Sequence, residues 1–127
     1  MSTVYCIEDW WHKYEPQAES CGANLPTATD WVKIPSDLNS DGYLRLVLDH
    51  PNGGQHLAVW TAILLAAANS KERQLHRWIH LPLRQDNGKP HSASTLSMKT
   101  NLPQEWFSEA LPRLCGPGIK WMSWHGE

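Results

Sequence analysis

The clearest hydrophobic pattern in the chain predicts one long central helix. Between Gly54 and Asn69, large apolar residues recur at steps of three and four, which places them on one face of a helix. The opposite face carries alanines instead of charged residues: Ala58, Ala62 and Ala66. A helix without a charged face is buried on more than one side. We therefore expect this helix to form the centre of the domain.

A second, shorter helix is predicted over residues 92–100. It begins at Ser92, a residue type that commonly caps helix N-termini. Leu96 and Lys99 lie one turn apart within it. We expect a short helix with its capping residue on the surface.

A third helix is predicted directly after the second. Asn101 can cap it, Pro103 is tolerated in the first turn, and Gln104 stands three residues on, as in a capping box. Pro112 removes one helical hydrogen bond and predicts a kink or an early end. The expected buried stripe consists of Phe107, Ala110, Leu111 and Leu114.

Signals for strands are weaker than those for helices. Residues 31–34 form a short strand-like run, and the alternation over 43–48 is compatible with a strand or a helix. Residues 75–83 fit an edge strand or an irregular extended segment, because Pro82 excludes a central strand. Residues 119–124 predict a final strand.

Residues 1–30 show no sustained periodicity and predict an N-terminal arm, separate from a domain over residues 31–127. A short helix is compatible with residues 8–14. Trp10 and Trp11 are neighbours and point to different faces, so they are difficult to bury together and predict a protein-interaction surface. The arm is compatible with mobility and with packing on the core through one of these two tryptophans.

Length and composition limit the class of protein. A chain of 127 residues suffices for one domain, and 41% hydrophobic with 19% charged residues excludes a disordered chain. The apolar run over 62–68 is too short to span a membrane, and the N-terminus lacks a secretory pattern. Three cysteines without close spacing argue against a disulfide framework and fit a reducing compartment. We expect a cytoplasmic protein that does not associate with membranes.

The order of the predicted elements is helix, extended segment, short helix, tight turn, helix, glycine, strand. This is the order of a helix-turn-helix followed by the first strand of a wing. The run from Leu96 to Pro103, the apolar stripe after it and Gly118-Ile119 resemble the winged-helix N-terminal domains of phage and bacterial replication-initiation proteins, including replisome-organizer and DnaD-like proteins. The aromatic-bearing helix over residues 56–65 fits the same resemblance, which covers about residues 31–124.

The resemblance implies an α+β fold of the winged helix-turn-helix type, with a three-helix core, short strands and a truncated wing. The wing is truncated because the chain ends soon after the first wing strand. Either the wing is absent or the sequence is the N-terminal piece of a longer protein. The resemblance also implies double-stranded DNA, a second copy of the chain or replication proteins as partners.

The charge distribution bears on DNA binding. The net charge of −2 is unlike that of most nucleic-acid binders, but residues 71–127 hold eight basic and five acidic groups. In a helix-turn-helix the third helix enters the major groove, where Gln104 can pair with adenine beside Ser108, while Glu105 and Glu109 repel phosphate. The remaining candidate DNA contacts are Ser92, Ser94, Thr95, Lys99, Thr100 and Asn101, with a basic flank of Arg77, Arg84, Arg113 and Lys120.

Other chemistry has little support in the sequence. Cys6, His12 and Cys21 lack a Cys-x-x-Cys pair and a nearby fourth zinc ligand. Asn52-Gly53-Gly54 lacks the pattern of a phosphate-binding loop and predicts the turn before a helix. We expect no metal, no cofactor and no enzymatic activity. The main hypothesis is DNA binding or replisome assembly, and the alternative is an oligomerisation domain on the same scaffold without DNA binding.

Overall fold

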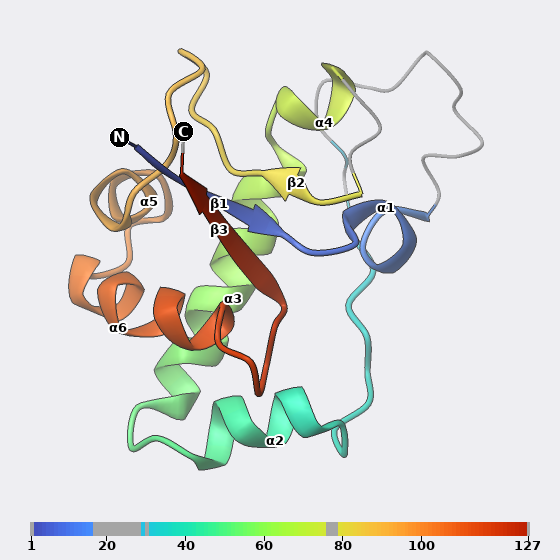
Figure 1. Ribbon diagram of the computed structural model, residues 1–127, viewed down its shortest axis with the longest axis vertical. Helices are drawn as coiled ribbons and strands as arrows, with labels where there is room; N and C mark the ends of the chain where they lie inside the picture. The colour runs from blue at the N-terminus through green and yellow to red at the C-terminus, as the bar shows by residue number, and fades with distance from the viewer. Residues whose placement is uncertain (1, 17–28, 30, 76–78, 127) are drawn as a thin grey trace.

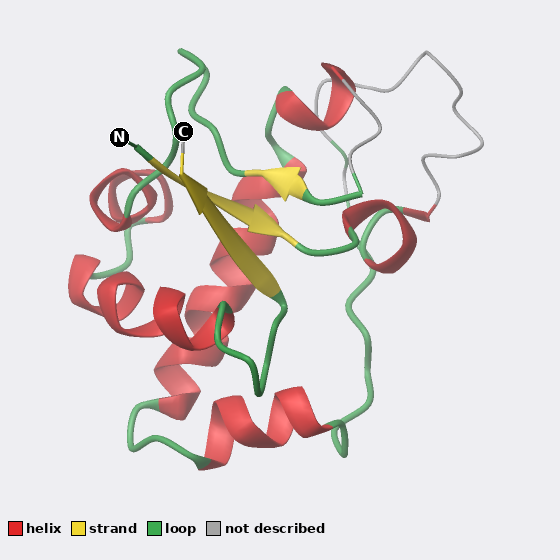
Figure 2. Ribbon diagram, viewed as in Figure 1, coloured by secondary structure: helices red, strands yellow, loops and turns green. Residues whose placement is uncertain are grey.

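A computed structural model describes residues 2–16, 29, 31–75 and 79–126, which form an α+β fold with a small antiparallel sheet packed against helices (Figures 1 and 2). The elements in chain order are β1 (Thr3–Ile7), α1 (Trp10–Lys13), α2 (Asp41–Leu48), α3 (Gly53–Ala68), α4 (Glu72–Leu75), β2 (Leu81–Pro82), α5 (Ala93–Thr100), α6 (Gln104–Leu114) and β3 (Met122–Gly126). Figure 1 shows α3 crossing behind the sheet, with α5 and α6 on one side and α1 and α4 on the other.

The N-terminal segment supplies the central strand of the sheet. The strand order is β2-β1-β3, and β1 pairs antiparallel with both neighbours. Cys6 lies opposite Pro82 on one side and opposite Ser123 on the other. The expectation of a separate arm is therefore wrong for residues 2–15, which belong to the domain. Residues 17–28 lie outside the described part of the chain.

The predicted strands are only partly confirmed. Pro82 does lie in an edge strand, as its missing N–H requires. Residues 31–34 form no strand, and residues 43–48 belong to helix α2, which Ser40 caps through its side chain. The last strand begins at Met122 and not at residue 119, because the chain first turns at Lys120, where φ is 52°.

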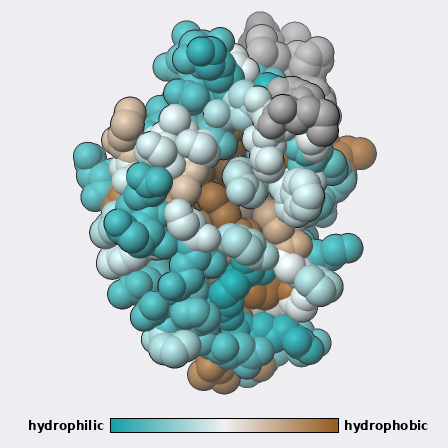
Figure 3. Space-filling model, turned by 60° about the vertical axis from the view of Figure 1, so that its left-hand side comes forward, coloured by the Kyte–Doolittle hydropathy of each residue, from teal (hydrophilic) through white to brown (hydrophobic). Residues whose placement is uncertain are grey.

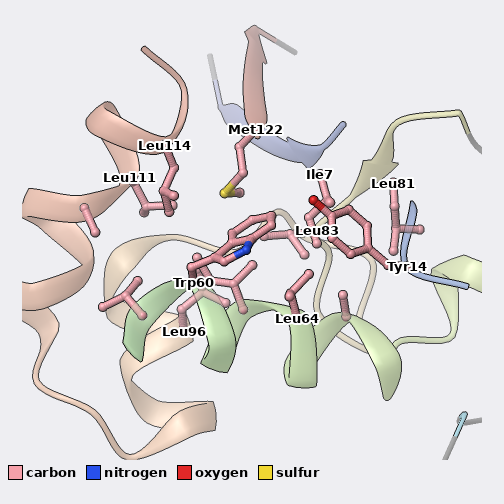
Figure 4. Packing of buried hydrophobic residues seen from close by; sticks show 14 of the residues in the cluster. Ile7, Tyr14, Trp60, Leu64, Leu81, Leu83, Leu96, Leu111, Leu114 and Met122 are labelled. Atoms are coloured by element: carbon pink, nitrogen blue, oxygen red, sulfur yellow. The ribbon is translucent and has the colours of Figure 1, made fainter. Parts of the chain in front are cut away.

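The predicted central helix is confirmed as α3, and the core is built on it. Trp60 and Ile63 are almost fully buried, and the alanines on the other side of α3 at positions 62 and 66 are buried as well. Figure 4 shows Trp60 between Leu111 and Leu114 of α6 on one side and Ile7, Leu83 and Tyr14 on the other. Ala58, the third alanine of that side, is exposed, and so is Leu65, so the expected burial of α3 holds for most of its surface and fails along one side.

Trp10 and Trp11 are both buried, so the expected interaction surface at this pair is wrong. The backbone N–H of Trp10 donates to the carbonyl of Ile79 (2.8 Å), which ties α1 to the segment before β2. The Trp10 indole donates to Glu15 (2.8 Å) and lies 5.5 Å from the Tyr14 ring. Both faces of α1 are thus covered by the same domain, which gives each indole its own buried site.

The two C-terminal helices form where the sequence predicts them, with one difference in capping. Ser92 caps α5, and its side chain and that of Thr95 form a capping box. Asn101 does not cap α6; it ends α5 in the left-handed conformation with φ of 63°. Pro112 does not end α6, since Ser108, whose carbonyl loses the helical bond, is exposed to water.

None of the described helices combines the length and the apolar character that a membrane span requires.

Candidate nucleic-acid interface

Helices α5 and α6 form a pair joined by a three-residue turn and fixed on α3. Leu96 of α5 and Phe107 of α6 are fully buried in the core that both helices share with α3. Inside the turn, the Ser97 hydroxyl donates to the carbonyl of Leu102 (2.6 Å), and the left-handed Asn101 reverses the chain. The pair therefore consists of two short helices joined by a turn that local hydrogen bonds hold in place.

The exposed side of α6 is the one that the sequence predicts. The four residues of the apolar stripe are buried, and the polar residues between them face solvent. A shallow hollow on the surface is lined by Gln104, Glu105, Ser108 and Glu109. Figure 3, with the α5–α6 side turned forward, shows a mostly hydrophilic surface that smaller hydrophobic areas interrupt at the centre and at the lower end.

The predicted DNA contacts fall into two groups in the structure. The first group is exposed to solvent: Ser94, Lys99, Asn101, Gln104, Ser108 and Lys120. The second group is half-buried: Thr95, Thr100 and Arg113. Thr95 completes the α5 capping box, and the Thr100 hydroxyl donates to the carbonyl of Leu96 (2.7 Å). The structure places Lys120 beyond the C-terminal end of α6, in the turn to β3.

Arg113 does not belong to a basic flank, which corrects the expectation for this residue. Its guanidinium donates to the carbonyls of Arg45 (2.6 Å) and Leu46 (3.0 Å) at the end of α2. It also donates to Nδ1 of His56 (2.6 Å). Arg113 thus satisfies the Leu46 carbonyl near the C-terminus of α2 and is a second donor to the Arg45 carbonyl, which also accepts the N–H of Asp49 (3.2 Å). These bonds clamp α6 to α2 and α3. Of the other predicted flank residues, Arg77 lies outside the described residues.

The contact of Arg113 is part of a polar bridge between α3 and α6, made by Asn52, His56, Glu109 and Arg113. Arginine can only donate, so Nδ1 of His56 is an acceptor and Nε2 carries the proton. That proton is directed at the Glu109 carboxylate, 2.7 Å away, to which the Asn52 amide also donates (2.9 Å). The His56 imidazole therefore bridges the positively charged guanidinium of Arg113 and the negatively charged carboxylate of Glu109.

The polar bridge also defines the most metal-like cluster among the described residues. His50, His56 and Glu109 each offer a ligand atom within 4.8 Å of the others. The contact with Arg113, however, leaves the His56 nitrogen that faces Glu109 protonated, and Nδ1 of His50 accepts the N–H of Asn52 (3.0 Å). A metal would have to remove the proton from His56 and break the hydrogen bond that His50 accepts, so these contacts favour a hydrogen-bonded bridge.

The cysteines considered for zinc show the properties of ordinary thiols. Cys6 and Cys115 are free, and burial raises the pKa of each to about 11, which keeps both protonated at neutral pH. His12 contacts the carboxylate of Asp9 at 2.7 Å. Cys21 lies outside the described residues.

Two buried histidines predict a loss of stability at acid pH. Burial is the main cause that lowers the pKa of His56 and of His91 below 6.5, so the folded state binds fewer protons than the unfolded chain. Hydrogen bonds from Asn52 and His56 lower the pKa of Glu109 below 4.5. The stability that each group contributes is complete above its unfolded pKa and is lost as the pH falls toward the folded pKa.

We therefore expect the urea midpoint of unfolding to fall between pH 7.5 and pH 5 as the two histidines are protonated, whereas the contribution of Glu109 is lost only below about pH 4.5. Urea titrations followed by tryptophan fluorescence at pH 7.5, 6 and 5 measure this. A midpoint that stays constant or rises over this interval contradicts the assignment of His56 and His91 as neutral groups.

Sequence reasoning missed the polar bridge, although one signal for it exists. His56 stands four residues before Trp60 and seven before Ile63, on the buried side of α3, and a polar residue there requires a partner. The partner itself lies 53 residues later in the chain and has no signal of its own. Glu109, which the sequence suggests as a source of repulsion for phosphate, is instead held by hydrogen bonds to Asn52 and His56.

Comparison with known proteins adds no family: no protein-family profile, no curated protein and no solved structure matches this chain.

Proposed function

We propose that the chain is a DNA-binding or replisome-assembly module of the winged helix-turn-helix type, in which the exposed side of α6 faces duplex DNA. The observation that carries the proposal is the α5–turn–α6 unit, whose buried stripe is seated on α3 while Gln104 and Ser108 remain exposed. An exposed second helix on a rigid support is what entry into a major groove requires. No enzymatic activity, cofactor or metal forms part of the proposal, and the compartment is the cytoplasm.

The sheet supports the winged-helix part of the proposal. β3 follows α6, in the place of a first wing strand, and its antiparallel partner is β1 from the N-terminus. Thr3 pairs with Gly126 and Ile7 with Met122, so the pairing extends along the full length of both strands. β1 thus takes a position beside β3 that a second wing strand would fill.

The charges on the exposed side predict modest affinity. Lys99 at the end of α5 is exposed, whereas Arg113 is engaged in the polar bridge. The carboxylate of Glu109 is turned toward Asn52 and His56, which reduces its repulsion of phosphate, while Glu105 is exposed. With few cations on this side, we expect micromolar binding and a shallow dependence on salt.

Fluorescence anisotropy of a labelled random duplex, at 20 mM and then 150 mM salt, tests the proposal. Lys99→Ala is expected to weaken binding and to reduce the salt slope by about one unit, because one phosphate contact is lost. Gln104→Ala is expected to weaken binding with little change in the slope. Lys71→Ala removes an equally exposed lysine before α4 and serves as the matched control. Equal binding by all four proteins would remove α5 and α6 from DNA recognition.

The alternative, an oligomerisation domain on the same scaffold, has an observation of its own. A groove of about 610 Å³ lies between α1, α3 and the segment before α2, with Leu57, Trp60 and Trp121 among its lining residues. Leu38, which also lines the groove, is 62% exposed. Sedimentation velocity distinguishes the two functions: dimers that form with rising protein concentration, without any binding to DNA at 20 mM salt, would favour this alternative.

A further inference from the structure

A second hollow, of about 450 Å³, lies beside α5, and we call it the α5 cavity. It is lined by residues of the C-terminal part of α3, the segment from Leu83 to Asn87, His91 and α5. Leu83 and Ala66 are buried in its wall, and Met98 stands exposed at its edge. The volume falls within the range of sites that bind small molecules.

Cationic and polar groups gather on one side of the α5 cavity. Lys99 and Arg84 line it together with one acid, Asp86. Arg84 is partly engaged, since it donates to the carbonyl of Gly88 (3.2 Å) and lies 3.9 Å from the carboxylate of Glu72. Lys99 forms no ion pair with any of the described residues, so its charge is available to a ligand.

His91 also lines the α5 cavity. His91 is only 7% exposed, and its Nδ1 lies 2.9 Å from the Thr95 hydroxyl. Nε2 has no partner within the part of the chain that the structure describes. Burial, and then the charge of Lys99, lowers the pKa of His91, while Asp86 acts in the opposite direction. The ammonium and the imidazole therefore act on the same space.

We propose that the α5 cavity binds a nucleotide, with its phosphate on Lys99 and Nε2 of His91 and its base against Leu83, Ala66 and Met98. An anion beside His91 offsets the charge of Lys99 and favours the imidazolium, so binding is accompanied by proton uptake at Nε2. The apolar wall adds burial for a base that inorganic phosphate lacks. The α5 cavity shares Lys99 with the proposed DNA interface, and this inference goes beyond that interface because His91 and the apolar wall are not part of it.

Isothermal titration with nucleoside 5′-monophosphates and with inorganic phosphate at pH 7 tests the inference. We expect nucleotides to bind at submillimolar concentration and inorganic phosphate to bind at least tenfold more weakly. Lys99→Ala, at an exposed position that does not affect folding, is expected to weaken nucleotide binding about tenfold, and Lys71→Ala is expected to leave it unchanged. The His91 ring resonances in NMR spectra are expected to show a higher pKa with nucleotide bound, and His91→Gln is expected to abolish proton uptake.

A second titration, with duplex DNA, distinguishes a free nucleotide from a phosphate of the DNA strand as the ligand. If free nucleotides bind and DNA does not, the cavity stands and the proposed DNA interface fails. If only DNA binds and His91→Gln weakens it, the cavity holds a phosphate of the DNA strand. If DNA binds equally to wild type and His91→Gln, and no nucleotide binds at 5 mM, the α5 cavity is not a nucleotide site and the DNA interface is unaffected.

Discussion

Replacing Arg73 with alanine is expected to lower the free energy of unfolding by about 3–5 kcal/mol, because the substitution leaves a buried carboxylate without its partner. Arg73 and Glu15 are both about 99–100% buried. The guanidinium Nε donates to Oε1 of Glu15 (2.9 Å), and Nη2 pairs with the other carboxylate oxygen. The same Oε1 accepts the indole N–H of Trp10 (2.8 Å), so the pair connects α1 to α4.

Two further variants separate the cost of an unpaired charge from a general packing defect. The double variant Glu15→Gln with Arg73→Met removes both charges and keeps an oxygen that accepts the Trp10 indole, so it is expected to recover most of the lost stability. Lys71→Ala removes an exposed cation two residues away and is expected to change stability by less than about 0.5 kcal/mol. Urea unfolding at pH 7.5 measures all three. A loss below about 1 kcal/mol for Arg73→Ala would show that the pair is open to water.

The elements that the sequence predicts well are those with a local pattern. Helix α3 and the buried stripe of α6 follow from residue spacing alone, and Phe107 is fully buried as the stripe requires. The strand β1 has only five residues, and its partners lie near the opposite end of the chain, so its role depends on pairing that no local pattern encodes. The burial of Trp10 likewise depends on a pair of residues 58 positions apart.

The same distinction applies to the candidate interface. The exposure of Gln104 and Ser108 follows from the periodicity of α6, because the buried stripe determines which residues remain outside. The position of Arg113 does not, since its acceptors are backbone carbonyls 67 and 68 positions earlier. A carbonyl at a helix end has no signature in the sequence. The sequence therefore could not show that Arg113 binds the end of α2 and not DNA.

Replacing Gly53 with alanine is expected to separate α2 from α3 and to lower the free energy of unfolding by about 3 kcal/mol. A Cβ at Gly53 would lie 2.2 Å from the carbonyl oxygen of Val47 and 2.7 Å from that of Leu46. These are backbone atoms at the end of α2, so no side-chain rotation relieves the contact. The Leu46 carbonyl also accepts Arg113, so its displacement would loosen the clamp on α6 as well.

Gly54 provides the matched control for this prediction, because it is the next residue of the same helix and a Cβ there would meet nothing within 4 Å. Gly54→Ala is expected to raise stability by about 0.5 kcal/mol, since alanine loses less backbone entropy in a helix than glycine. Thermal and urea unfolding of the two variants are compared with wild type. If Gly53→Ala destabilises the protein and Gly54→Ala stabilises it, the close contact between α2 and α3 is what requires glycine at position 53. If both substitutions stabilise the protein, that close contact does not exist. If Gly53→Ala remains folded, it is also expected to bind duplex DNA more weakly than Gly54→Ala, because the clamp that positions α6 begins at the carbonyl it displaces.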